Sequence, residues 1–303
     1  MRHSHLDTFA MTTMVLLCAT WGLTQPTVKM AAAEIGPVLQ GGLRCLIASV
    51  LVVLWCRLRG IRLFSRDGSL PGGLLVGTLF AAEFAALFKG LEYTQAARAV
   101  LFLYCAPFIV ALGGHFRLGE RLGPVQWVGL ACAFTGLIVG MGDSLSLPGG
   151  RELIGDLLAL IAGLLWAATT LGIRLTRAGS VAPAKTLLYQ LGMSVVVMIP
   201  LGLLMGEPWP QFTALSGTAW GVLLFQGVVI SFASYLMWFS LVSRYPAGLL
   251  SAFSFLTPLF GMAFGALLLG ERLTLPFLLA ATLVGAGIWL VNRRPRRQEE
   301  KIP

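Results

Sequence analysis

Hydrophobic residues along this chain gather in runs of about 20, and polar residues are confined to the short segments between the runs. A helix of about 20 residues crosses the roughly 30 Å hydrocarbon layer of a bilayer. The connecting segments leave no room for a soluble domain, so the pattern predicts an all-α integral membrane protein with ten transmembrane helices. Their expected approximate boundaries are 8–28, 37–56, 71–89, 97–117, 124–142, 153–173, 186–205, 218–241, 247–269 and 274–292.

The fourth and ninth runs repeat one another. The segment 97–121 recurs 151 positions later, and at this one offset Pro107 meets Pro258. A Leu-Gly-Glu-Arg-Leu block at 118–122 also meets an identical block at the same offset. Internal duplication with a proline inside an apolar segment is typical of transporters whose substrate site lies between two repeats, near the middle of the membrane.

The duplication divides the chain into two predicted five-helix repeats. The first covers residues 8–142, the second covers 153–292, and a basic tail at 293–303 follows. Because five is an odd number, the second repeat is expected to enter the membrane in the opposite sense to the first. The two repeats are therefore predicted to be inverted relative to one another.

Composition agrees with a membrane protein. The chain is 57% hydrophobic and 12% charged, with a mean hydropathy of +0.83, whereas soluble domains carry about 25% charged residues. The net charge of +9 would suggest a nucleic-acid partner in a soluble chain. Here most basic residues lie in short loops and in the tail, so we interpret them as a topology signal that contacts lipid headgroups. We expect membrane lipid, and no nucleic acid, as a partner.

The distribution of lysine and arginine predicts the orientation, because cytoplasmic loops carry an excess of both. With the N-terminus inside, sixteen fall in inner segments and five in outer segments. We therefore expect both termini in the cytoplasm and the protein in a bacterial inner membrane. The inner residues are Arg2, Arg57, Arg59, Arg62, Arg66, Arg117, Arg121, Arg174, Arg177, Lys185, Arg244, Arg293, Arg294, Arg296, Arg297 and Lys301; the outer ones are Lys29, Lys89, Arg98, Arg151 and Arg272.

Several features occur in the same order in both halves. A tryptophan lies in the first helix (Trp21, Trp166), a proline in the fourth (Pro107, Pro258), and a Gly-Glu-Arg-Leu turn follows it. In this order, over about residues 8–292, they resemble the EamA family of the drug/metabolite transporter superfamily. The resemblance implies a ten-helix bacterial permease with a basket-shaped fold. It also implies a central cavity lined by helices 1–4 and 6–9, helices 5 and 10 at the periphery, and movement of small metabolites or amino acids, often outward.

Two ionisable residues lie inside predicted spans. Such a residue costs about 2.5–3.5 kcal/mol on insertion scales, so by default it marks a pathway. Arg44 lies roughly 10 Å from the outer end of its helix, and Glu83 roughly 13 Å from the outer end of the third helix. They could form a structural ion pair, contact substrate or a proton directly, or not meet at all. If they act directly, Glu83 would titrate or meet a cationic group and Arg44 would hold a carboxylate.

Two tryptophans are predicted near the bilayer centre, away from the headgroup region where aromatic belts form. Trp21 stands about thirteen residues into the first helix, and Trp166 has a similar depth in the sixth. An indole N–H in lipid lacks a partner, so a position facing a wet cavity costs less. The alternative is core packing, with the N–H bonded to a neighbouring helix. On the first interpretation the two residues face each other across the substrate.

Other polar, aromatic and proline residues complete the candidate site. Kinks at Pro26, Pro107 and Pro258 could free carbonyls that bind substrate or act in gating; plain helix bending is the alternative. The additional candidate substrate contacts are Gln25, Tyr104, Tyr235 and Trp238.

The remaining charges receive structural interpretations. Glu120 and Arg121, like the second Gly-Glu-Arg block, are expected to close a hairpin, with the glutamate near the next helix's N-terminus, where the helix dipole favours an anion. Asp156 is expected in the first turn of the sixth helix. Arg98 could either extend to the headgroups or guard the mouth of a cavity.

No catalytic, metal or cofactor site is predicted. His3, His5 and His115 cannot be grouped with a third ligand in a span, and the five cysteines show no C-x-x-C spacing. The sequence lacks the common hydrolase and nucleotide-binding motifs, so an enzyme is disfavoured. We therefore expect a secondary transporter that exports a small-molecule substrate as a monomer or homodimer, with protons as the candidate coupling ion. A passive channel is the alternative, and transport by alternating access is favoured because inverted repeats supply two equivalent gates.

Overall fold

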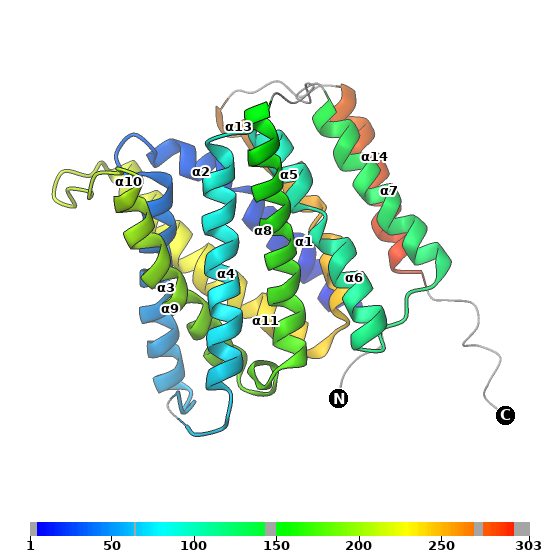
Figure 1. Ribbon diagram of the computed structural model, residues 1–303, viewed down its shortest axis with the longest axis horizontal. Coiled ribbons are helices and arrows are strands. Elements are labelled where there is room, and N and C mark those ends of the chain that lie inside the picture. Colours follow the sequence, from blue (N-terminus) through cyan, green and yellow to red (C-terminus); the bar gives the residue numbers. More distant parts are fainter. Residues whose placement is uncertain (1–4, 64, 143–149, 270–274, 294–303) are drawn as a thin grey trace.

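The protein is a bundle of long helices (Figure 1). The computed structural model describes residues 5–63, 65–142, 150–269 and 275–293, and no strand occurs in these residues. The α-helices are α1 (Thr8–Gly22), α2 (Thr24–Ala31), α3 (Pro37–Leu58), α4 (Leu70–Leu91), α5 (Ala96–Leu103), α6 (Ala106–Arg117), α7 (Pro124–Met141), α8 (Gly150–Leu175), α9 (Pro183–Leu204), α10 (Gly217–Leu224), α11 (Tyr235–Arg244), α12 (Ala247–Phe253), α13 (Leu256–Leu269) and α14 (Leu275–Val291); η2 (Arg177–Ser180) is a 3₁₀ turn and η3 (Phe225–Ser234) a π-helix.

The described part of the chain has eight helices that are long and apolar enough to cross a membrane. Three of these eight combine consecutive elements, such as α5 with α6, and α14 is a shorter apolar helix of 17 residues. The all-helical architecture expected from the hydropathy pattern is confirmed for these residues. The expected number of ten spans stays a prediction.

Three of the predicted spans are interrupted helices. The interruptions separate α1 from α2, α5 from α6, and α12 from α13. Pro26, Pro107 and Pro258 each lie in the first turn after the break. Proline has no N–H to donate to the carbonyl four residues earlier, and its ring clashes with that carbonyl. The helix direction can therefore change at these points without loss of any further hydrogen bond.

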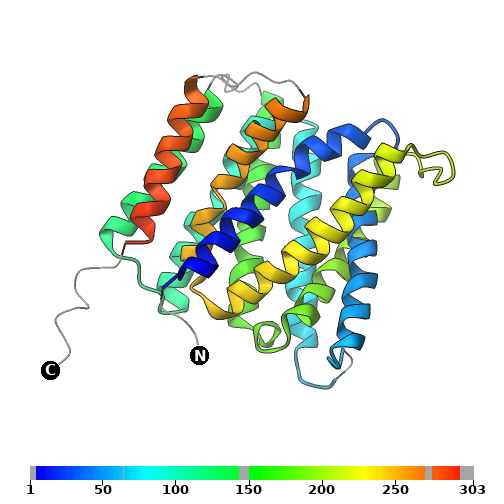
Figure 2. The ribbon, with the colours of Figure 1, turned by 180° about the vertical axis from the view of Figure 1, so that it is seen from behind.

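The eighth predicted span has a different irregularity. α10, η3 and α11 run on without a break, and the ten residues of η3 form a π-helix. Figure 2 shows this segment as the long yellow rod that crosses in front of α3 and α9. π-Helical turns are wider than α-helical turns and often occur at functional sites. Here the π-helix ends immediately before Tyr235, one of the predicted site residues.

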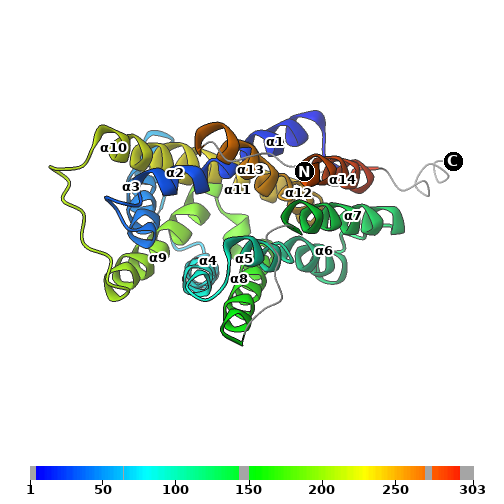
Figure 3. The same cartoon turned by 90° about the horizontal axis from the view of Figure 1, so that it is seen from above.

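The helices α7 and α14 lie side by side at one edge of the molecule (Figures 1 and 3). They approach closely because small residues face one another: a Cβ on Gly129 would lie 2.6 Å from the carbonyl oxygen of Gly287, and one on Gly136 would lie 3.0 Å from that of Ala280. Between these contacts, Cys132 Sγ donates to the carbonyl of Leu283 over 3.4 Å. Membrane helices commonly associate through such small residues.

We expect Gly287→Leu to lower the melting temperature of the purified protein, because the new side chain would collide with the backbone of α7. A Cβ at residue 287 would lie 2.5 Å from the carbonyl oxygen of Gly129, and overpacking of this kind typically costs about 1–3 kcal/mol. The matched control is Gly285→Leu on the same helix, where a Cβ meets nothing within 4 Å. Equal melting temperatures for the two variants would refute the close packing of α7 and α14.

Two loop carboxylates each bind the beginning of a helix in the other half of the chain. Glu207, between α9 and α10, accepts hydrogen bonds from the backbone N–H groups of Val38 (3.0 Å) and Leu39 (2.8 Å) at the start of α3. Asp67, between α3 and α4, accepts one from Lys185 Nζ at the start of α9 (2.7 Å). The Lys185 ammonium holds the pKa of the Asp67 carboxyl well below its usual range. The second helices of the two halves, α3 and α9, are thus bound reciprocally.

A buried ion pair, which we call the first clamp, joins the beginning of α8 to α5. Arg98 binds both carboxylate oxygens of Asp156, with Nε to Oδ1 at 3.1 Å. Thr94 Oγ1 donates to the same Oδ1 at 2.7 Å. Neither predicted role of Arg98 included this pairing. α8 begins at Gly150, so Asp156 lies in its second turn rather than in the first turn as expected.

A second buried ion pair, the second clamp, joins the end of α8 to the turn between α6 and α7. Arg174 Nη2 lies 2.6 Å from Glu120 Oε1, and the side chains are only 5% and 12% exposed. Glu120 Oε2 also accepts the N–H of Ala247 (2.9 Å) at the start of α12. The glutamate therefore stabilises the start of α12 rather than that of the next helix, α7. The second Gly-Glu-Arg turn lies outside the described residues.

Candidate functional site

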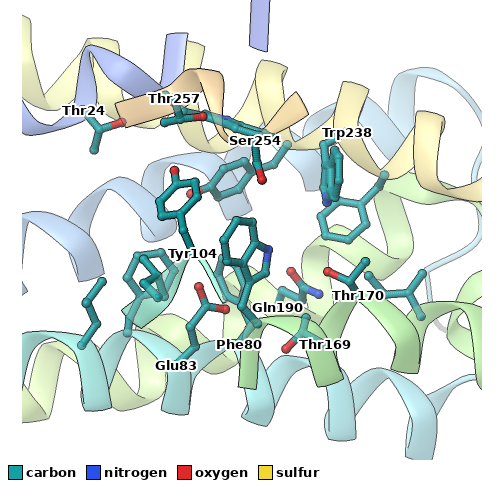
Figure 4. Close-up of a pocket in the computed structure, with 18 of the residues that line it drawn as sticks. Thr24, Phe80, Glu83, Tyr104, Thr169, Thr170, Gln190, Trp238, Ser254 and Thr257 are labelled. Atoms are coloured by element: carbon teal, nitrogen blue, oxygen red, sulfur yellow. The ribbon is translucent and has the colours of Figure 1, made fainter. Parts of the chain in front are cut away.

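A cavity of about 200 Å³ lies where the interrupted helices meet the continuous ones (Figure 4). Its described lining comes from α1 to α5, the break after α5, α8, α9, α11, the break after α12, and α13. None of these residues belongs to α7 or α14. The cavity is somewhat larger than the roughly 150 Å³ cavity that holds a benzene molecule in an engineered protein, so a small organic molecule fits.

Most of the predicted substrate contacts line this cavity. They are Trp21, Arg44, Glu83, Tyr104, Trp166, Tyr235 and Trp238. The side chain of Gln25 lies outside the part of the chain that the structure describes. Pro26, Pro107 and Pro258 are not part of the lining, but the breaks that they follow and the helix starts beside those breaks contribute Thr24, Tyr104, Ser254 and Thr257 to it. That the lining residues bind substrate stays a prediction.

Arg44 and Glu83 are the charged residues of the described lining. Both are buried, at 5% and 7% exposure. No ion pair joins them in the described part of the chain, so the first of the three predicted arrangements is not formed. Arg44 Nε and Glu83 Oε2 each lack a hydrogen-bond partner. The guanidinium instead lies over the ring of Phe84, 5.5 Å from its centre.

Aromatic rings form two walls of the cavity. Trp21 contacts Tyr235 and Trp238 edge to face, at centroid distances of 6.3 and 5.7 Å. Its Nε1 donates to Ser234 Oγ over 2.9 Å, so the indole N–H is satisfied by a neighbouring helix while the ring lines the cavity. On the other wall Tyr104 contacts Trp166, 5.5 Å away. The two tryptophans thus belong to separate aromatic groups around one cavity.

The sequence prediction missed several polar lining residues. Gln190 is fully buried, and both polar atoms of its amide lack a partner. The hydroxyls of Thr169 and Thr257 are buried without a partner as well. A signal for Gln190 was present: it follows the first proline of α9, Pro183, by seven residues, as Arg44 follows Pro37 in α3. The two residues therefore occupy the same position relative to the start of their helices.

The arrangement suits reversible binding of a polar organic molecule. A buried polar group without a partner is unfavourable, and this cavity gathers a guanidinium, a carboxylate, an amide and two hydroxyls in that condition. A ligand or water that enters would satisfy them. Among the described residues no cluster of His, Cys, Asp or Glu could hold a metal ion. The aromatic walls provide apolar contact area.

Comparison with known proteins places the chain in a family. The sequence model of the EamA-like transporter family matches residues 8–141 and 153–293. The chain belongs to this family. The resemblance found from the order of tryptophans, prolines and Gly-Glu-Arg turns is thereby confirmed, and the EamA-like chain is a multi-pass membrane transporter.

Individual relatives of this EamA-like transporter are distant. It is 28% identical to the "Probable amino-acid metabolite efflux pump" of Escherichia coli over 91% of this chain and 92% of that one. It is 24% identical to the "Uncharacterized transporter YoaV" of Bacillus subtilis over 89% and 92% of the two chains. A solved crystal structure with 20% identity matches 93% of this chain and 95% of that chain with a TM-score of 0.79, which supports the fold alone.

Proposed function

We propose that this EamA-like protein is a secondary transporter that moves a small organic metabolite, an amino acid or a related compound, across the bacterial inner membrane by alternating access. The observation that carries the proposal is a cavity with unsatisfied polar atoms that is lined by helices of both halves. Export is the proposed direction, because the relative from Escherichia coli is named as a probable efflux pump.

The alternating-access part of the proposal rests on two inverted repeats. Reciprocal contacts support this arrangement: the loop after α9 binds the start of α3, and the loop after α3 binds the start of α9. Such exchange is expected when a two-fold axis relates the halves. α1 begins and α14 ends at the same end of the bundle (Figure 1), and by the excess of basic residues we assign this end to the cytoplasm.

Counterflow in proteoliposomes tests the proposal against a passive channel. A carrier exchanges substrate, so solute on the far side of the membrane accelerates entry of labelled solute; a channel shows no such acceleration. We would screen labelled amino acids, amines and other small organic acids, each with and without a pH gradient. Acceleration by the far-side solute supports the carrier. Its absence for every solute that the protein transports would reject alternating access, and a response to the gradient would identify proton coupling.

We expect Trp21→Ala and Trp166→Ala each to reduce counterflow at least tenfold while leaving the melting temperature nearly unchanged. Each truncation removes a cavity wall, and a wall beside an existing space tolerates truncation better than a packed core does. The matched control is Trp289→Ala on α14, a tryptophan 58% exposed and remote from the cavity lining. Normal transport by both cavity variants, or a loss explained entirely by unfolding, would mean that these tryptophans only pack.

A further inference from the structure

The cavity holds a guanidinium and a carboxyl group that form no ion pair with each other. Arg44 extends from α3 and Glu83 from α4, and both line the same space. Each is more than nine-tenths buried. If they served only to hold the helices together, they would be expected to form an ion pair, as the buried charges of the first and second clamps do. Both groups therefore remain available to a molecule in the cavity.

The atoms left without partners show where a ligand would bind. Arg44 Nε is an unsatisfied donor and Glu83 Oε2 an unsatisfied acceptor. Gln190, at the same position relative to its helix start as Arg44, adds an unsatisfied amide to the same lining. Figure 4 shows the carboxylate of Glu83 and the amide of Gln190 directed into the cavity from different helices. Donors and acceptors are thus both present, on different helices.

A buried charge is strongly unfavourable unless it is paired and hydrogen-bonded. An anionic ligand would pair with Arg44 but leave the buried carboxyl of Glu83 without a partner, and a cationic ligand would pair with Glu83 but leave Arg44 without one. A ligand with one group of each sign satisfies both residues together, because its cationic group also favours the ionised form of the Glu83 carboxyl. The aromatic rings of Phe80, Tyr104 and Trp166 leave apolar surface for the remainder of such a molecule.

We propose that Arg44 and Glu83 form a two-charge site that selects small dipolar solutes: Arg44 binds the anionic group, Glu83 binds the cationic group, and solutes with only one of these charges bind weakly. This inference rests on the proposed transport function and adds to it the residues that determine specificity. It assigns a group of the ligand to each side chain, so the assignment can be tested group by group.

The test is a double-mutant cycle between protein and ligand, measured as binding to purified protein by calorimetry. The probes are leucine, isopentylamine, which lacks the carboxylate, and 4-methylpentanoate, which lacks the ammonium group. We expect the wild type to bind leucine at least tenfold more tightly than either analogue. In Glu83→Gln the preference for leucine over 4-methylpentanoate should disappear, and in Arg44→Gln the preference for leucine over isopentylamine should disappear.

Control variants separate recognition from folding. Arg44→Lys and Glu83→Asp keep the charges and should keep the preference for leucine. Comparison with these variants separates a loss of ligand recognition in the neutral variants from a failure of the neutral variants to fold. Lys89→Gln, on the same helix as Glu83, removes a charge that is 48% exposed and pairs with Glu92; it should leave all three affinities unchanged.

The outcomes distinguish this inference from the transport proposal. Affinity for 4-methylpentanoate equal to that for leucine in the wild type would overturn the two-charge site, as would preferences that neither neutral variant changes. No binding of leucine or of other small dipolar amino compounds would overturn it too. The expected binding pattern without counterflow would keep the two-charge site and reject the carrier. Counterflow of singly charged solutes alone would keep the carrier and reject the two-charge site.

Discussion

Asp156→Asn is expected to destabilise the protein by about 3–5 kcal/mol, the usual cost of removing one partner of a buried ion pair. The side chains of Asp156 and Arg98 are 6% and 9% exposed. The carboxylate of Asp156 accepts bidentate hydrogen bonds from Arg98 and a further hydrogen bond from Thr94. Asparagine keeps the size but loses the charge, so the guanidinium is left in a buried position without its counter-charge. Thermal or denaturant unfolding of the detergent-solubilised protein measures the effect.

The exposed pair of Lys89 and Glu92 provides the matched control. Its side chains are 48% and 37% exposed, and exposed pairs contribute about 0–1 kcal/mol. Glu92→Gln should therefore change stability little. The double variant Asp156→Asn with Arg98→Gln should recover part of the loss, because it removes the uncompensated charge. A single Asp156→Asn variant as stable as Glu92→Gln would contradict the role of the first clamp.

Glu120→Gln is expected to make the cavity open more readily at the end of the molecule where α1 begins. Glu120 joins Arg174 on α8 to the start of α12, and Arg174 also donates to the carbonyls of Val242 (3.2 Å) and Tyr245 (2.8 Å). Hydrogen bonds to charged groups contribute about 1.5–3 kcal/mol. Loss of the charge should therefore shift the equilibrium toward the open form by about tenfold to a hundredfold.

Thiol labelling measures this opening. Ile173→Cys, in the cavity lining next to Arg174, would be placed in a chain whose five native cysteines are replaced by alanine. An impermeant methanethiosulfonate reaches opposite faces of the membrane in inside-out vesicles and in spheroplasts. We expect Glu120→Gln to accelerate the reaction of this reagent with the cysteine at position 173 in only one of the two preparations. Arg121→Gln, an exposed neighbour in the same turn, is the control and should not change the rate. Equal rates for both variants would exclude the second clamp as a barrier.

The sequence was sufficient to predict the class of fold, because the mean hydropathy of about 20 consecutive residues indicates directly whether a helix is surrounded by lipid or by water. The helix breaks also followed from it, since Pro26, Pro107 and Pro258 act on the backbone within their own turn. The residues predicted to contact substrate came from a comparable argument: a charge or an indole at mid-membrane depth needs a polar neighbour. Arg44, Glu83, Trp21 and Trp166 accordingly line one cavity.

Contacts between distant segments could not be predicted in this way. Arg98 and Asp156 are 58 positions apart and belong to different halves, and depth alone does not say which helices are neighbours. The same reason explains the incorrect pairing considered for Arg44 and Glu83, which share a depth but form no ion pair. Gln190 was overlooked because a neutral amide costs less in a membrane than a charge. Comparison of Pro37 and Pro183 as helix starts would have revealed it.

The close contact between α7 and α14 has a bearing on how the protein arose. With the 151-residue offset, Gly129 corresponds to Ala280, Gly136 to Gly287, and Cys132 to Leu283. If each residue is replaced by its counterpart in the other half, the contact of Gly129 with Gly287 becomes the contact of Ala280 with Gly136, which is also present. The contact of Cys132 with Leu283 is unchanged, because these two residues are counterparts of each other. A self-complementary surface of this kind is what two identical subunits form in a symmetric dimer. If the two halves are inverted repeats, as we propose, an ancestral protein half this length could have inserted in both directions and met its own copy along this helix before two copies of its gene were fused.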